Sequence, residues 1–120
     1  MSLWDVFKEP AEEAWRGRSL LSIFSELERG EVRLGVAGRI RGGADVRSCL
    51  EGGVDFVLPG RAAILHHDLP ERIRSDPDFT AIETPVSADY LRQEGLGEKF
   101  IEYMSSWAGF VEPGPEEETR

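Results

Sequence analysis

Two stretches of sequence decide the fold, Val32-Arg-Leu-Gly-Val-Ala-Gly-Arg-Ile-Arg41 and Val54-Asp-Phe-Val-Leu-Pro-Gly-Arg-Ala62. Each is a short apolar run that ends in Gly-Arg, which is typical of a buried parallel strand that opens into a glycine turn. Between them lies Ala44–Gly53, whose one-sided apolar spacing and final glycines predict a helix. A strand, a helix and a strand within about thirty residues form a βαβ unit, so we expect the two strands to be parallel neighbours.

The two Gly-Arg turns form a candidate anion-binding site. Because parallel strands end at the same edge of a sheet, we expect Gly38 and Arg39 to lie beside Gly60 and Arg61. Glycine lets the backbone approach a ligand closely, and free N–H groups together with an arginine can bind a phosphate. A short helix after Gly60 would point its N-terminus at the same anion.

Capping residues and apolar spacing predict the other elements. Helical segments are expected at Leu20–Arg29, Ala62–Leu65, Leu69–Arg74, Ala88–Glu94 and Glu98–Trp107. Ser19, Asp68 and Ser87 precede three of them as N-cap candidates. Residues 76–85 contain two prolines and no periodicity, which predicts a loop, and the acidic, proline-rich residues 112–120 are expected to be disordered.

Composition excludes several classes of function. The 120 residues suffice for one small domain, and the net charge of −9 argues against a nucleic-acid partner, which would need a basic surface. One anionic ligand is still compatible, because salt screens distant charges beyond about 10 Å. No apolar run reaches eighteen residues, so no membrane partner is expected. Cys49 is the one cysteine, which excludes a disulfide framework and favours a cytoplasmic protein.

Two parallel strands do not make an independent sheet, so this βαβ unit needs a larger host. The commonest host is a (β/α)₈ barrel of roughly 250 residues. We therefore expect an α/β fold in which residues 1–111 form the carboxy-terminal portion of a TIM barrel, with its last two strands, their helices and a helical C-terminal tail.

The motifs resemble a known family. Leu34–Ile40, Ala44–Val46, Gly53–Ala62 and Asp68–Pro70 are similar to the carboxy-terminal part of the old yellow enzyme family of NAD(P)H-dependent flavin oxidoreductases. Those proteins are built on a barrel that holds FMN. The stretch Ser2–Asp5 resembles the end of the sixth strand of that barrel.

The resemblance implies a cofactor and a role. In this family the turns after strands seven and eight hold the FMN phosphate, which assigns Gly38, Arg39, Gly60 and Arg61 to cofactor binding. The implied activity is reduction of an activated alkene with NAD(P)H as the hydride source. The family's substrate-binding histidines and tyrosine proton donor lie on earlier strands, so no catalytic residue is assigned. The chain is expected to be inactive alone and to work with the rest of the barrel or as a homo-oligomer.

Other readings stay open. Similar glycine turns occur in dihydroorotate-dehydrogenase-like and IMP-dehydrogenase-like barrels, and a non-catalytic remnant that oligomerises is a further alternative. His66 and His67 are interpreted as surface or capping histidines, and Asp55 as a carboxylate that accepts backbone hydrogen bonds. The three tryptophans are interpreted as core or docking aromatics. For Tyr103 and Trp107 the resemblance implies a second interpretation, in which they close the flavin site of a neighbouring subunit.

Overall fold

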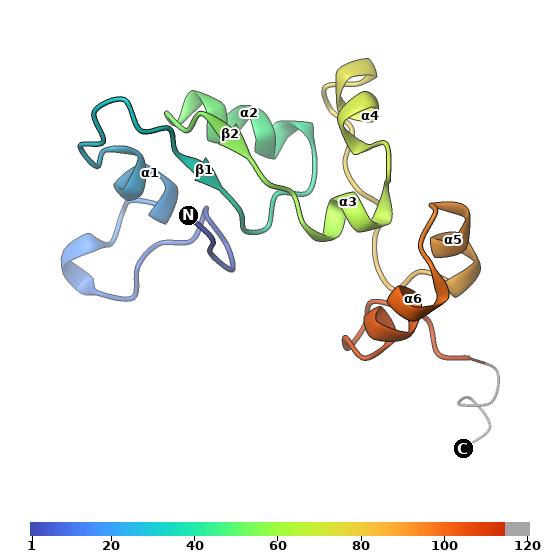
Figure 1. Ribbon diagram of the computed structural model, residues 1–120. Helices are drawn as coiled ribbons and strands as arrows, with labels where there is room; N and C mark the ends of the chain where they lie inside the picture. Colours follow the sequence, from blue (N-terminus) through green and yellow to red (C-terminus); the bar gives the residue numbers. More distant parts are fainter. Residues whose placement is uncertain (115–120) are drawn as a thin grey trace.

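The computed structural model describes residues 1–114 and shows a mixed α/β fold that is mostly helical (Figure 1). The predicted α/β class is confirmed. The elements in chain order are η1 (Glu13–Trp15), α1 (Leu20–Ser25), β1 (Gly35–Val36), α2 (Gly43–Glu51), β2 (Phe56–Val57), α3 (Arg61–Leu65), α4 (Leu69–Ser75), α5 (Ala88–Gln93) and α6 (Glu98–Ser105).

The βαβ unit forms as predicted. Strands β1 and β2 are parallel, with Val36 opposite Val57, and α2 connects them. The apolar residues of this half form one core cluster: Val6, Leu21, Val36, Ile40, Cys49 and Val54. Asp55 accepts a hydrogen bond from the backbone N–H of Leu34 at 2.7 Å, which confirms its interpretation as a structural carboxylate.

The N-terminal segment lies along β1 and is also parallel to it. Ser2 forms a parallel bridge with Ala37, and the N–H of Leu3 donates to the Ala37 carbonyl at 2.8 Å. The carbonyl of Val36 instead accepts the N–H of Leu58, which lies on the β2 side. Since neighbouring residues of a strand direct their backbone groups to opposite sides, three parallel segments follow one another in the order N-terminal segment, β1, β2.

Gly38 is required by this close approach. Its φ is +138°, and a Cβ atom there would lie 2.2 Å from the carbonyl oxygen of Leu3. A side chain at this position would therefore push the N-terminal segment away from β1.

A second core cluster lies in the C-terminal half of the chain. Its buried residues are Ala62, Leu65, Leu69, Ala81, Val86, Leu91, Ile101, Met104 and Phe110. The two clusters give an elongated molecule of 53 × 36 × 24 Å (Figure 1). Its radius of gyration is 17.1 Å, whereas a compact domain of this length has about 14 Å.

The helix boundaries follow the predictions closely except in α1. This helix ends at Ser25 rather than near Arg29, and the guanidinium of Arg29 satisfies a terminal acceptor by donating to the Ser25 carbonyl at 2.9 Å. The 3₁₀ turn η1 lies in a segment for which the sequence pattern predicts no helix. The N-caps at Ser19 and Ser87 are confirmed, since each hydroxyl oxygen accepts a backbone N–H in the first turn of its helix.

The end of the described chain is held against the loop before α5. Val111 forms a parallel bridge with Val86, and the N–H of Glu112 donates to the Val86 carbonyl at 2.8 Å. The rest of the predicted disordered tail, residues 115–120, lies outside the described residues. Within residues 1–114, no helix is long and apolar enough to cross a bilayer.

Candidate anion-binding site

The four predicted binding residues follow the two strands. Gly38 and Arg39 come just after β1, and Gly60 and Arg61 come just after β2. Because the two strands are parallel and in register, both turns emerge at the same edge of the sheet. Two turns that are separated by a helix in the sequence therefore follow paired strands at one edge of the sheet.

Both turns offer unused backbone donors. Within residues 1–114, the N–H groups of Gly38, Arg39, Gly60 and Arg61 have no hydrogen-bond acceptor. A Cβ atom on Gly60 would meet nothing within 4 Å, so the space in front of this turn is open. An anion that enters this space can accept hydrogen bonds that the chain itself leaves free.

The side chain of Arg39 is directed to the N-terminal segment. Its φ is +58°, in the left-handed region that is uncommon for residues other than glycine, and its Nη1 lies 3.7 Å from Oδ2 of Asp5. Asp5 in turn accepts the backbone N–H of Phe7 at 2.9 Å. The Arg39 guanidinium therefore already has a carboxylate beside it, and its backbone N–H is the more available donor.

Arg61 has a different environment. Its guanidinium carbon lies 5.3 Å from the centroid of the Trp4 ring and 4.9 Å from that of Trp107, over the face of each indole. Among the described residues, no carboxylate or carbonyl accepts a hydrogen bond from this guanidinium, unlike Arg39 and Arg41, which each pair with a carboxylate. Arg61 is thus an exposed cation with no counter-charge among residues 1–114.

Sequence reasoning missed the contact between Arg61 and the two tryptophans. Trp4 lies in the N-terminal segment and Trp107 follows α6, so no local pattern links them to Arg61. Trp4 is 82% exposed, which shows that it is not a core residue. The one available signal was the presence of a large aromatic next to a predicted strand end.

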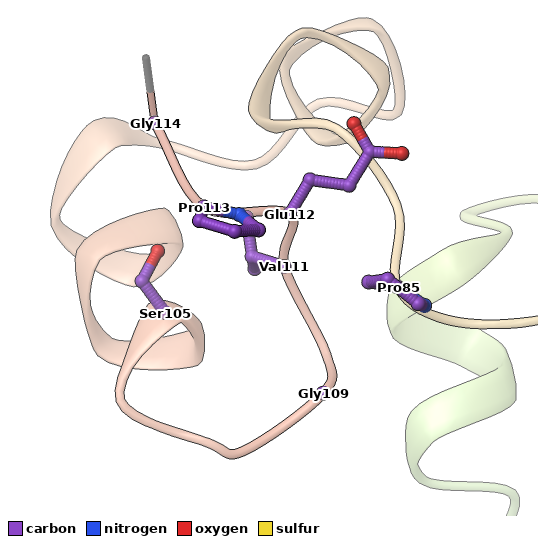
Figure 2. Close-up of a pocket in the computed structure, with 7 residues that line it drawn as sticks. All are labelled: Pro85, Ser105, Gly109, Val111, Glu112, Pro113 and Gly114. Atoms are coloured by element: carbon purple, nitrogen blue, oxygen red, sulfur yellow. The ribbon is translucent and has the colours of Figure 1, made fainter. Parts of the chain in front are cut away.

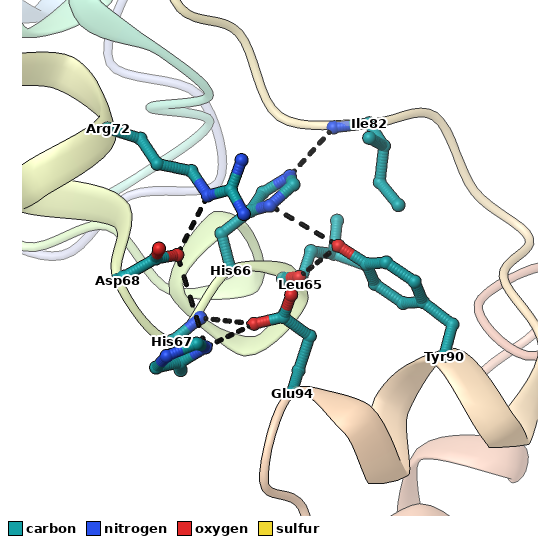
Figure 3. Close-up of polar contacts among 8 residues, drawn as sticks. All are labelled: Leu65, His66, His67, Asp68, Arg72, Ile82, Tyr90 and Glu94. Atoms are coloured by element: carbon teal, nitrogen blue, oxygen red, sulfur yellow. Dashed lines mark hydrogen bonds and ion pairs between the residues drawn. The ribbon is translucent and has the colours of Figure 1, made fainter. Parts of the chain in front are cut away.

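His66 is buried and part of a polar network (Figure 3). The sequence predicts a surface or a capping histidine at this position. His66 occupies the C-cap position of α3, but it does not lie at the surface. Its Nε2 accepts the backbone N–H of Ile82 at 3.1 Å, and its Nδ1 lies 3.3 Å from the Tyr90 hydroxyl, which donates to the Leu65 carbonyl at 2.7 Å. Burial lowers the pKa of His66, in agreement with a neutral ring.

A group of charged side chains lies next to this network (Figure 3). Both the backbone N–H and the ring Nδ1 of His67 contact one carboxylate oxygen of Glu94, and Arg72 donates to Asp68 at 2.8 Å. The hydrogen bond to Glu94 raises the pKa of His67, and the one from Arg72 lowers the pKa of Asp68. His67, Asp68 and Glu94 are close enough to hold a metal ion, but Asp68 is already paired with Arg72, and Glu94 with the His67 ring.

Cavities lie elsewhere on the molecule. One of about 340 Å³ is lined by Pro85, Ser105, Gly109, Val111, Glu112, Pro113 and Gly114 (Figure 2). Its one charged side chain is the carboxylate of Glu112, which would repel an anion. A second cavity of about 360 Å³ is lined by Asp68, Glu71, Arg72, Ser75, Asp76 and Phe79. Neither cavity includes the two strand-end turns.

Within the described part of the chain, the two turns and Arg61 combine free backbone donors with a positive charge that no carboxylate offsets, although the net charge is −9. Comparisons of the chain with protein-family models, curated proteins and solved structures find no match. What the chain does is therefore inferred from this geometry and from the sequence motifs.

Proposed function

We propose that this chain is the FMN-phosphate-binding part of an NAD(P)H-dependent flavin oxidoreductase that resembles the old yellow enzyme family. The observation that supports this most strongly is Arg61, whose guanidinium has no counter-charge in the described chain and which begins α3 directly after the open turn at Gly60. The fold proposed with it is the carboxy-terminal portion of a (β/α)₈ barrel.

A phosphate fits the donors at this edge. Adjacent strands are roughly 5 Å apart, so one phosphate can accept N–H groups from the turns at Gly38 and Gly60 together. The Arg61 guanidinium adds a forked donor whose geometry matches phosphate oxygens. Helix α3 has only five residues, so these N–H groups and this guanidinium, rather than a helix dipole, would hold the anion.

The three parallel segments support the barrel. The N-terminal segment, β1 and β2 lie side by side in chain order, as the sixth, seventh and eighth strands of such a barrel would. Phosphate sites of these barrels are formed by the loops after the last two strands. When bound, FMN supplies the hydride chemistry, and the residues of this chain bind and orient its phosphate.

Flavin titration tests the proposal. The 120-residue chain should bind FMN more tightly than riboflavin, which has the same ring system without the phosphate. Arg61→Ala should weaken FMN binding about ten- to a hundredfold, because a charge-assisted hydrogen bond contributes about 1.5–3 kcal/mol. Gly60→Val should weaken it as much, since the new side chain would occupy the space beside the turn, where an added Cβ atom meets nothing within 4 Å.

The matched control is Arg33→Ala, which removes an exposed arginine at the opposite end of β1. It should leave FMN affinity within about twofold of the parent, since long-range charge effects are screened. Equal affinity of the parent for FMN and riboflavin, or equal losses for Arg61→Ala and Arg33→Ala, would overturn the proposal.

A further inference from the structure

We infer that Trp4 and Trp107 are positioning residues for the phosphate, because their indole faces converge on the Arg61 guanidinium and hold its N–H donors free for the anion. This inference rests on the proposed function and assigns two residues that the motifs do not include. By this inference, the N-terminal segment and the residue after α6 both contribute to one binding site.

The contacts join three distant parts of the chain. Trp4 lies in the segment beside β1, Arg61 begins α3, and Trp107 follows α6. Trp107 is itself held by neighbours, since its ring centroid lies 6.1 Å from that of Tyr103, which lies 5.9 Å from Phe100. Two rings from independent elements therefore limit where the Arg61 side chain can move.

Indole rings position a cation without neutralising it. A carboxylate beside Arg61 would accept its N–H donors or offset its charge, and Asp5 lies near Arg39 in this way, at 3.7 Å. An indole face attracts the guanidinium through its quadrupole and has no oxygen to accept strong hydrogen bonds. The positive charge thus stays available for a phosphate, although the chain carries a net charge of −9.

Positioning should increase affinity. A free arginine has several rotatable bonds, and fixing them when the ligand binds costs free energy. If the tryptophans already restrict the side chain before binding, that cost is smaller and the phosphate binds more tightly. The effect requires a planar group that can stack on a ring, so lysine at position 61 should not benefit from it.

The experiment measures FMN and riboflavin affinity of the full chain by flavin fluorescence. Trp4→Leu and Trp107→Leu should each weaken FMN binding about three- to tenfold, as loss of one cation–π contact implies. Riboflavin binding should stay unchanged, which a general loss of structure would not produce. Trp4→Phe and Trp107→Phe should keep most of the affinity. Trp15→Leu removes an exposed tryptophan from η1 and is the matched control.

A double variant separates positioning from folding. In the Arg61→Ala background, Trp107→Leu should weaken FMN binding no further, because the residue it positions is already gone. If the parent prefers FMN and Arg61→Ala abolishes the preference, but both leucine variants retain it, this inference fails and the proposed function stands. If the parent binds FMN and riboflavin alike, the proposed function fails and this inference fails with it.

Discussion

Two adjacent histidines, His66 and His67, have opposite electrostatic surroundings. His66 is buried, and its Nε2 accepts the backbone N–H of Ile82, an arrangement that a protonated ring cannot make. His67 is exposed and contacts the carboxylate of Glu94, which stabilises its charged form. Burial, and then the nearby Arg72, lowers the pKa of His66, whereas the hydrogen bond to Glu94 raises that of His67.

These opposite shifts predict opposite pH dependences. The unfolded chain protonates His66 near pH 6.5, whereas the folded chain, in which the pKa of His66 is lowered, does so only at a lower pH. This residue therefore makes the free energy of unfolding fall as the pH drops below 6.5. His67 has the reverse effect, because its stabilising charge is present below pH 6.5 and is lost as the pH rises through its raised pKa. His67→Gln should therefore steepen the loss of stability between pH 7.5 and 5.5, and His66→Gln should remove it.

Urea unfolding at pH 7.5 and 5.5 measures both variants. Their neighbours Asp68, Arg72, Tyr90 and Glu94 keep their charge states over this range, so the difference between the two pH values reports on the histidines. Identical pH profiles for parent and both variants would contradict this account.

At the scale of elements, short helices depend on their caps. Helix α5 has six residues, and the hydroxyl of Ser87 accepts the N–H of Tyr90 at 3.0 Å at its start. The same helix supplies the buried Leu91 to the C-terminal core and the hydroxyl of Tyr90 to the His66 network. Loss of the cap thus affects both the core and the network.

Ser87→Ala should lower the free energy of unfolding by about 1 kcal/mol, the usual cost of removing a serine N-cap. The control is Ser48→Ala, an exposed position inside α2, where alanine favours the helix and stability should be equal or slightly higher. Thermal unfolding followed by circular dichroism compares the two variants. A Ser87→Ala variant as stable as the parent would show that the cap does not stabilise α5.

At the scale of the whole molecule, apolar surface is left uncovered. In β2 and just after it, Phe56 is 47% and Leu58 51% exposed, although both follow a pattern typical of buried strands. Covering such a side chain contributes about 1.5–3 kcal/mol, a large share of the 5–15 kcal/mol that stabilises a domain. The outer side of β2 also has unpaired backbone groups among the described residues, as edge strands do.

We therefore expect the isolated chain to self-associate rather than behave as a compact monomer. Sedimentation velocity should show species larger than a 13.4 kDa monomer at micromolar concentration. Leu58→Lys, which places a charge at the β2 edge, should reduce this association. Val32→Lys changes an exposed side chain before β1 and should not. A compact parent monomer with a sharp cooperative melt would refute the expectation.

The proposed function also makes activity a property of a whole barrel rather than of this chain. The 120-residue chain with added FMN should not oxidise NADPH with an enone acceptor. The proton donor and carbonyl-binding residues implied by the resemblance have no counterpart in it, and each such group contributes on the order of 10²–10⁴-fold. The assay follows NADPH absorbance with and without the enone, and FMN-stimulated turnover by the pure chain would disprove the prediction.

The sequence by itself determined the βαβ unit, the caps at Ser19 and Ser87 and most helix boundaries. These features depend on interactions within a few residues or on the spacing of apolar side chains. They can therefore be predicted without knowing how the chain folds in three dimensions. The placement of Gly38 and Gly60 at one edge followed from the parallel pairing of their strands. The four candidate residues were identified on the same basis.

Only the tertiary structure decided which side chains meet across long stretches of chain. It brought Trp4 and Trp107 to Arg61 and buried His66 against Ile82 and Tyr90. Such contacts depend on how whole elements pack, and residues far apart in the sequence leave no periodic signal of their meeting. Secondary structure was thus determined by nearby residues, whereas the surroundings of Arg61 were determined by the tertiary packing of the whole chain.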